Sequence, residues 1–186
     1  GGADPELDLS QLWALLLQLR QVHGIRTLGA DIVVDRTLFR PVQPEREAQP
    51  FDERPEFAYN LVPDALQLNS HLLQIEISSE TGTPQARALP PLPGLVIDAS
   101  ALQLTDRPCA EWTKGWDSPP PADSSAPGVL RVRLQGGFPR GCVQRPSLYL
   151  LDALALAERQ LRWLWTSLGG EWQGRLREAD TPTVPL

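Results

Sequence analysis

Lysine is nearly absent from this chain of 186 residues, which carries 17 basic side chains but only one lysine, Lys114. The other positive charges are arginines that are scattered along the chain, and the net charge is −6. Proteins that bind nucleic acid or an anionic membrane surface concentrate basic residues in one patch. The composition therefore argues against both kinds of partner.

Long apolar runs are also missing, since no stretch approaches the roughly 18 residues that a membrane span requires. The chain does not begin with the basic and apolar regions of a secretory leader. It begins instead with GGADPELDLSQLW, which places two glycines and an Asp-Pro step directly before a helical pattern. We expect this start to be a cut within a longer protein, a processed end, or the start of a cytosolic chain.

Several catalytic motifs are absent as well. No serine lies three residues before Lys114, so the chain holds no Ser-x-x-Lys nucleophile, and no Gly-x-Ser-x-Gly elbow occurs. The opening glycines lack the preceding strand and the following Gly-Lys of a phosphate-binding loop. His23 falls at the end of a predicted helix and His71 in a predicted strand, where we interpret both as surface or half-buried residues. Taken by themselves, the residues of this chain do not indicate a catalytic centre.

Cysteine occurs only twice, at Cys109 and Cys142. No other metal-binding residues cluster near them, so we expect no metal site and no cofactor. The residues themselves leave open whether the pair forms two buried free thiols or a disulfide. A disulfide would place the protein in an oxidising compartment.

Helical periodicity is clear at both ends of the chain. In QLWALLLQLRQV the apolar residues predict one buried stripe, made of Leu12, Leu15, Leu16, Leu19 and Val22. Asp8 or Ser10 can cap this helix and Gly24 can end it. A second helical pattern covers residues 150–168. We expect the tryptophans of these helices to pack in the core, namely Trp13, Trp163 and Trp165.

The two ends share a spacing after their helices. Each carries two glycines five residues apart and an aspartate six residues later: Gly24, Gly29 and Asp35 at one end, and Gly169, Gly174 and Asp180 at the other. We interpret the ends as two related helix–strand units in one layer, with residues 32–34 as a buried strand. Chance repetition is the alternative.

The middle of the chain is predicted to form strands and turns rather than helices, because most of the 19 prolines lie there and proline disfavours a helix interior. Residues 66–77, 94–104 and 128–139 alternate as strands do, whereas residues 117–128 predict a flexible loop. The predicted fold is therefore α+β or α/β. A small helix–strand layer is formed by residues 1–56 and 141–186, and a β-rich domain, residues 57–140, is inserted between them.

The order of these segments resembles the central, non-catalytic region of class C low-molecular-mass penicillin-binding proteins, the D-alanyl-D-alanine carboxypeptidase/endopeptidases. GGADPEL at residues 1–7 matches the stretch that follows the family's Ser-x-x-Lys. Residues 29–39 match its Gly-Asp-hydrophobic-Asp-x-x-x-Phe strand, although Ala30 separates the glycine from the aspartate. Tyr59 and residues 63–69 match a later segment. The family's Ser-x-Asn and Lys-Thr-Gly motifs would follow Leu186.

This resemblance implies that the parent protein is a periplasmic serine peptidase that trims the stem peptides of peptidoglycan, with a serine acylated and then released by water. The chain itself would supply no catalytic residue and would frame the cleft. Some family members carry cysteines at the positions of Cys109 and Cys142, so the resemblance favours the disulfide. It also makes Asp35 and Phe39 candidates for contacting the substrate's side chain, where a carboxylate could pair with an amino group.

Two alternatives stay open at this point. Asp35 and Asp98, the carboxylates that stand out in strands, could simply cap turns, and Phe39 could be a core residue. The chain could also be a stand-alone extracytoplasmic binding or scaffold module without a catalytic partner. An unrelated α/β binding protein is a third interpretation, which would be favoured if the two helix–strand units did not share a sheet.

Overall fold

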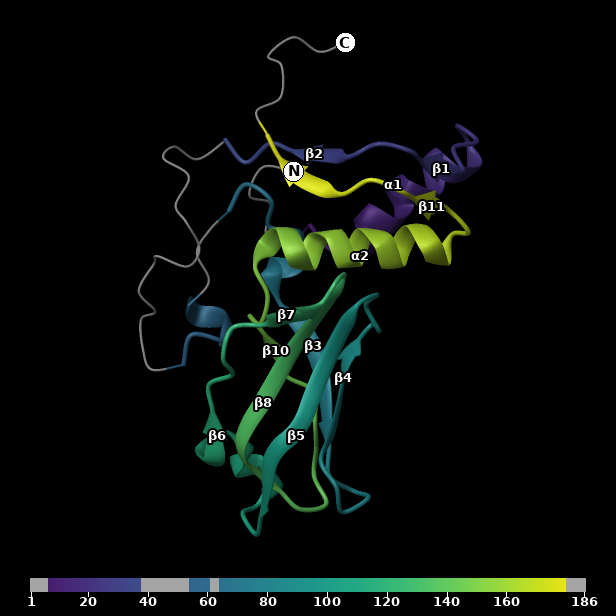
Figure 1. Ribbon diagram of the computed structural model, residues 1–186. Helices are drawn as coiled ribbons and strands as arrows, with labels where there is room; N and C mark the ends of the chain where they lie inside the picture. Colours follow the sequence, from purple (N-terminus) through teal and green to yellow (C-terminus); the bar gives the residue numbers. More distant parts are fainter. Residues whose placement is uncertain (1–6, 38–53, 61–63, 180–186) are drawn as a thin grey trace. The chain divides into compact units, whose positions relative to one another are not determined.

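The computed structural model describes residues 7–37, 54–60 and 64–179. The chain divides into two compact units (Figure 1). Unit 1 comprises residues 1–49, 61–71 and 152–186, and unit 2 comprises residues 50–60 and 72–151. Helices and strands are mixed, which confirms the predicted α+β class. The inserted domain at residues 57–140 stays a prediction; in the compact units, residues 61–71 group with unit 1 and residues 141–151 with unit 2.

Unit 1 is built from two helix–strand–strand segments that come from the two ends of the chain. Its elements are α1 (Leu9–Gln21), β1 (Thr27–Leu28), β2 (Ile32–Val34), the 3-10 segment η2 (Leu68–His71), α2 (Ala153–Ser167), β11 (Glu171–Trp172) and β12 (Leu176–Glu178). β1 pairs with β11 and β2 pairs with β12, both in parallel. The predicted layer formed by the two chain ends is therefore confirmed.

Both helices begin at an aspartate that caps them. Asp8 accepts hydrogen bonds from the backbone N of Ser10 and Gln11 at 2.9 and 3.0 Å, and Asp152 accepts one from Ala155 N at 2.8 Å. These bonds satisfy backbone donors that the first helical turn leaves unpaired. Of the two caps predicted for α1, Asp8 is the one used.

The predicted stripe on α1 is only partly buried. Leu16 is buried and packs with Leu164 and Trp165, but Leu15 and Val22 are 53% and 72% exposed. The prediction was wrong for these two residues because the neighbours of α1 in this cluster, which come from α2, β1 and β11, leave part of the stripe uncovered.

Two further burial predictions were wrong in unit 1. Trp13 is exposed on α1, whereas Trp165 is buried as predicted and Trp163 is partly buried. Val33 in the middle of β2 is exposed although we predicted a buried strand. A pair of short parallel strands covered on one face leaves alternate side chains on the other.

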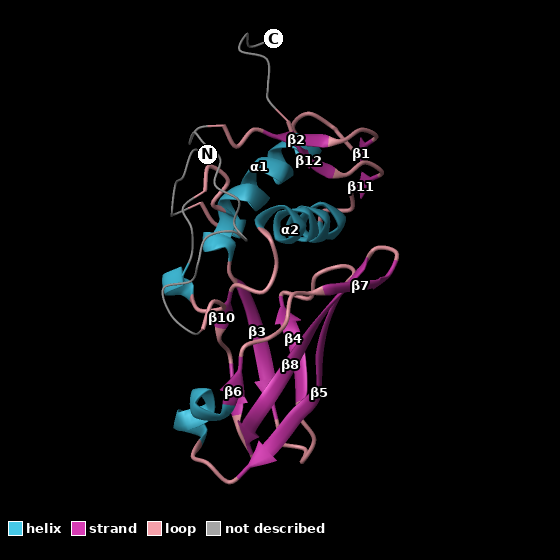
Figure 2. Ribbon diagram, turned by 60° about the vertical axis from the view of Figure 1, so that its left-hand side comes forward, coloured by secondary structure: helices cyan, strands magenta, loops and turns pink. Residues whose placement is uncertain are grey.

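Unit 2 contains two four-stranded sheets (Figure 2). The first runs β10 (Ser147–Leu148), β3 (Leu73–Ser78), β4 (Gln85–Leu89), and β9 (Val143–Gln144) also pairs with β3. The second runs β5 (Leu95–Thr105), β8 (Val129–Pro139), β6 (Trp116–Asp117), and β7 (Asp123–Ala126) also pairs with β8. The inward side chains are fully buried at Ile75, Ile77, Leu134 and Phe138.

The strands of unit 2 confirm two predictions and correct two others. β5 and β8 lie where the sequence alternates. Residues 117–128 do not form the predicted loop throughout, because β7 within them pairs with β8. The predicted strand at residues 66–77 begins only at Leu73, and His71 lies in η2 rather than in a strand.

Candidate functional site

The carboxyl ends of two parallel strands meet at one edge of unit 1. β2 and β12 are in register, with Val34 opposite Glu178 at this edge. Ligands commonly bind outside the carboxyl ends of parallel strands, because the loops that follow converge there. The predicted contact residue Asp35 follows β2 directly and therefore lies at this edge.

The Asp35 carboxylate is half-buried and holds the turn that follows β2. Its Oδ1 accepts hydrogen bonds from the backbone N of Thr37 at 2.9 Å and from the Thr37 hydroxyl at 2.6 Å. Asp98 makes a similar turn bond, from Ser100 N at 2.9 Å. Phe39 lies outside the described residues. A role of Asp35 and Phe39 in substrate contact stays a prediction.

Arg36, the next residue, is buried and joins three segments of unit 1. Its Nε donates to both carboxylate oxygens of Asp64, at 3.1 and 2.9 Å, and its Nη2 also donates to Asp64. Its Nη1 reaches Glu178 at 3.3 Å. This arginine therefore fixes the segment around Asp64 against the ends of β2 and β12.

The charge of Asp64 is stabilised within this cluster. Burial alone would raise the pKa of its carboxyl, but hydrogen bonds from Arg36 and from Leu66 N hold the pKa below its ordinary value. The Leu66 N bond is 2.7 Å long. Sequence reasoning missed this pair, because Arg36 and Asp64 are 28 residues apart and no periodic pattern links them.

His71 occupies a different position from the one predicted. It is buried at the end of η2, and its Nε2 contacts the carbonyl oxygen of Leu66. Asn69, Ser70 and His71 all have positive φ values, between 49° and 52°. The prediction of a surface or half-buried strand residue was wrong, because residues 69–71 form a left-handed turn instead of an extended strand and the His71 side chain is buried.

Neither a metal site nor a membrane span is found in the described part of the chain. No group of three or more His, Cys, Asp or Glu side chains in residues 7–37, 54–60 and 64–179 could hold a metal ion. No helix within these ranges is long and apolar enough to cross a bilayer.

The two cysteines form a disulfide, as the family resemblance favoured. Cys109 and Cys142 have Cα atoms 5.4 Å apart, a normal spacing for the bond. The bond ties the 3-10 segment η3 (Cys109–Gly115) to the residue before β9, and Cys142 is buried. The single lysine, Lys114, lies in η3, where it pairs with Glu111 at 2.9 Å.

The comparison with protein families identifies the chain. Residues 1–185 match the D-Ala-D-Ala carboxypeptidase 3 (S13) family. The chain belongs to this family. The match confirms the resemblance to the penicillin-binding carboxypeptidases that the order of segments indicated. No curated protein matches the sequence of this S13 chain.

Two crystal structures share the fold of the S13 chain. Both are penicillin-binding protein 4 (dacB) from Haemophilus influenzae, one of them complexed with a novel β-lactam (CMV). The complex matches 97% of the chain with a TM-score of 0.60, and the other structure matches 98% with a TM-score of 0.67, each at 18% identity. The S13 chain spans only 35% and 39% of the length of these proteins.

Proposed function

We propose that this chain forms the non-catalytic part of a serine-type D-Ala-D-Ala carboxypeptidase/endopeptidase that remodels peptidoglycan. The observation that carries the proposal is a family match over residues 1–185 in a sequence that contains no Ser-x-x-Lys, Ser-x-Asn or Lys-Thr-Gly. The acylated serine and the assisting lysine then come from polypeptide outside these 186 residues. The chain's role is to frame the cleft and to orient the substrate.

The carboxyl edge of β2 and β12 is the part of unit 1 that we propose faces the substrate. Asp35 lies there, and its bonds to Thr37 keep the carboxylate in one orientation. A carboxylate held in this way suits a charge-assisted hydrogen bond to an amino group on the stem peptide. Phe39 would provide an apolar contact nearby in sequence.

The proposed compartment is extracytoplasmic, in Gram-negative bacteria the periplasm. The disulfide between Cys109 and Cys142 supports this location, because such bonds persist in oxidising compartments and are rare in the cytosol.

Covalent labelling with a fluorescent penicillin tests the division of roles. The 186-residue chain should stay unlabelled because it has no nucleophile of the required kind. The complete product of the gene that encodes it should be labelled at a serine. Labelling of the 186 residues alone would show that the nucleophile was misassigned. An unlabelled complete gene product would instead favour the stand-alone binding module.

The role of Asp35 is tested in the complete enzyme with two stem peptides, one with a free side-chain amino group and one with that group acetylated. Asp35→Asn should lower kcat/KM for the free amine about tenfold, the loss of one charge-assisted hydrogen bond. The acetylated peptide should be unaffected. Asp31→Asn, which removes an exposed carboxylate paired with Arg177, serves as the matched control. An equal loss for both peptides would assign Asp35 to structure only.

A further inference from the structure

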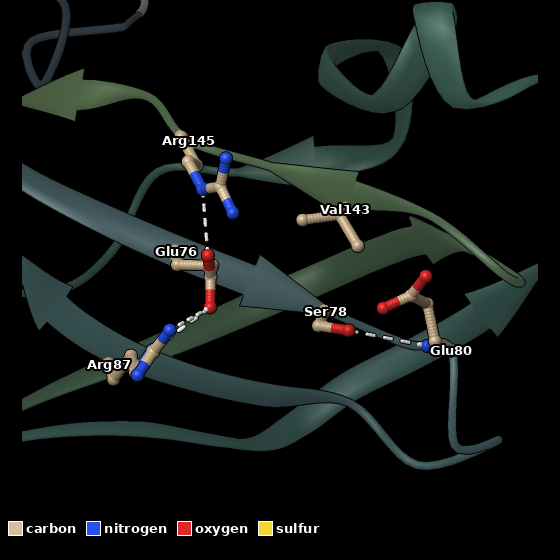
Figure 3. A pocket seen from close by; sticks show the side chains of 6 residues that line it. All are labelled: Glu76, Ser78, Glu80, Arg87, Val143 and Arg145. Carbon is tan, nitrogen blue, oxygen red and sulfur yellow. Dashed lines mark hydrogen bonds and ion pairs between the residues drawn. The ribbon is translucent and has the colours of Figure 1, made fainter.

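A pocket of about 610 Å³ opens on the outward face of the first sheet in unit 2 (Figure 3). Strand β3 alternates, so that Ile75 and Ile77 point into the core while Glu76 and Ser78 point outward. Arg87 on β4 lies opposite Glu76, and Val143 on β9 lies opposite Ser78. The pocket is lined by Glu76, Ser78, Glu80, Arg87, Val143 and Arg145.

Glu76 holds two arginines in place at one end of this pocket. Its side chain is only 14% exposed, whereas those of Arg87 and Arg145 are 69% and 63% exposed. Arg145 Nε donates to one carboxylate oxygen at 2.7 Å and Arg87 Nε donates to the other at 2.9 Å. The hydrogen bonds from Arg145 and then Arg87 hold the pKa of Glu76 below its usual value. Glu76 is therefore an ionised anchor for the two guanidinium groups.

Arg145 keeps unused donors after this pairing. Only its Nε donates a hydrogen bond to Glu76, and its two terminal nitrogens donate none to the residues that the structure describes. Figure 3 shows these nitrogens on the side of the guanidinium that is nearer to Val143. A guanidinium with a free terminal edge is suited to a carboxylate ligand, which it can bind through two parallel hydrogen bonds.

Glu80 provides the opposite charge. Its side chain is exposed, and within the described ranges its carboxylate has no cationic partner. The backbone N of Glu80 donates to Ser78 Oγ at 3.4 Å, which ties the residue to the end of β3. In Figure 3 the apolar side chain of Val143 lies between Arg145 and Glu80. The pocket thus has a cationic end, an apolar middle and an anionic end.

We propose that this pocket binds a small zwitterion of the α-amino acid class. The ligand's carboxylate bonds the terminal nitrogens of Arg145, its ammonium group pairs with Glu80, and a short apolar side chain covers Val143. The two glutamates and two arginines of the pocket sum to zero charge, so a ligand with both charges is matched better than an anion or a cation. The site lies outside the proposed substrate edge of unit 1 and requires no catalytic residue.

Titration of the isotope-labelled 186-residue chain with alanine, followed by NMR, tests this proposal. Either enantiomer of alanine should shift the backbone amide signals of residues 76–80 and 143–145 in a saturable way. N-acetylalanine, which lacks the cation, and alaninamide, which lacks the anion, should each bind about three- to fivefold more weakly, as expected for the loss of one partly exposed ion pair.

Two variants test which residue of the pocket binds each charged group of the ligand. Arg145→Gln should weaken alanine binding while leaving alaninamide binding unchanged, and Glu80→Gln should weaken alanine binding while leaving N-acetylalanine binding unchanged. Arg140→Gln, which removes an exposed arginine paired with Asp106, is the matched control and should bind alanine normally. A dispersed spectrum shows that each variant is folded. The proposal is overturned if neither enantiomer gives a saturable shift, if N-acetylalanine or alaninamide binds as well as alanine, or if both pocket variants bind alanine normally.

Discussion

The guanidinium of Arg162 lies over the indole ring of Trp172, with its Cζ atom 4.2 Å from the ring centroid. The same group donates to the carbonyl oxygens of Trp172, at 3.1 Å, and of Gly174. Its Nε donates to Glu158 at 2.9 Å. One side chain of α2 therefore binds Trp172 at the end of β11 and Gly174 in the turn that leads to β12.

Arg162→Lys should lower the free energy of unfolding of unit 1 by about 2 kcal/mol, because lysine cannot reproduce the planar set of hydrogen bonds or the stacking on Trp172. Urea unfolding, followed at amide signals of unit 1, measures the change. Arg175→Ala removes an exposed side chain and leaves the bond from its backbone N to Asp31 intact. This control should stay within about 0.5 kcal/mol of the parent chain, and an equally small effect of Arg162→Lys would contradict the assigned role.

Gly174→Ala should destabilise the pair of β2 and β12 by about 1–3 kcal/mol, as overpacking does. A Cβ atom at Gly174 would lie 2.1 Å from the carbonyl oxygen of Ala30, where only backbone movement could relieve the clash. Gly29 holds the corresponding place in the other half of the unit, yet a Cβ there would meet no atom within 4 Å. Gly29→Ala should therefore be tolerated. Thermal unfolding of the two variants side by side checks this asymmetry, which equal shifts in Tm would disprove.

Removal of the disulfide should destabilise unit 2 by about 3–4 kcal/mol on the chain-entropy model, because the bond closes a loop between cysteines 33 positions apart. Urea unfolding of the double variant Cys109→Ser, Cys142→Ser measures this loss. Alkylation under denaturing conditions should add two groups only after reduction. Two groups added without reductant would show free thiols instead.

The stability of unit 1 should depend on pH through Asp64. The folded-state pKa of this carboxyl is lowered from 3.8, so its ionised form stabilises the fold above about pH 4. This contribution disappears as the pH falls through the lowered pKa. Asp64→Asn should cost about 3 kcal/mol at pH 7, because Arg36 is buried and loses its main partner. Urea unfolding at several pH values should show the difference from the parent chain narrowing below pH 4.

Asp106→Asn is the control for this pH series. Asp106 is 94% exposed and pairs with Arg140 at the surface. Its replacement should change the free energy of unfolding by less than about 0.5 kcal/mol at any pH in the series. A pH-independent cost of Asp64→Asn would show that the side chain acts by packing rather than by charge.

Local patterns in the sequence were sufficient to predict the two helices and the paired strands of unit 1. Asp8 caps a helix and Gly169 directly follows the C-cap of α2 with a φ of 74°. The shared spacing of glycines at the two ends predicted strands that pair, and these strands do pair in parallel. Such features depend on a few neighbouring residues, so the chain itself specifies them.

Burial and charge pairing depended on the tertiary structure. Leu15 and Leu16 are both apolar and adjacent in sequence, but only Leu16 faces α2. The spacing of the two glycines predicted equal roles for Gly29 and Gly174, but only Gly174 faces a carbonyl oxygen from the neighbouring segment.

The sequence by itself determined the family, the mixed fold class and the absence of the family's catalytic motifs, since these depend on residue order alone. Only the tertiary structure decided that Glu76 meets Arg145, 69 positions away, and that Arg36 meets Asp64. The physical reason is that alternation along a strand fixes which face a side chain occupies. Its partner depends on which segments, distant in sequence, the fold brings beside it.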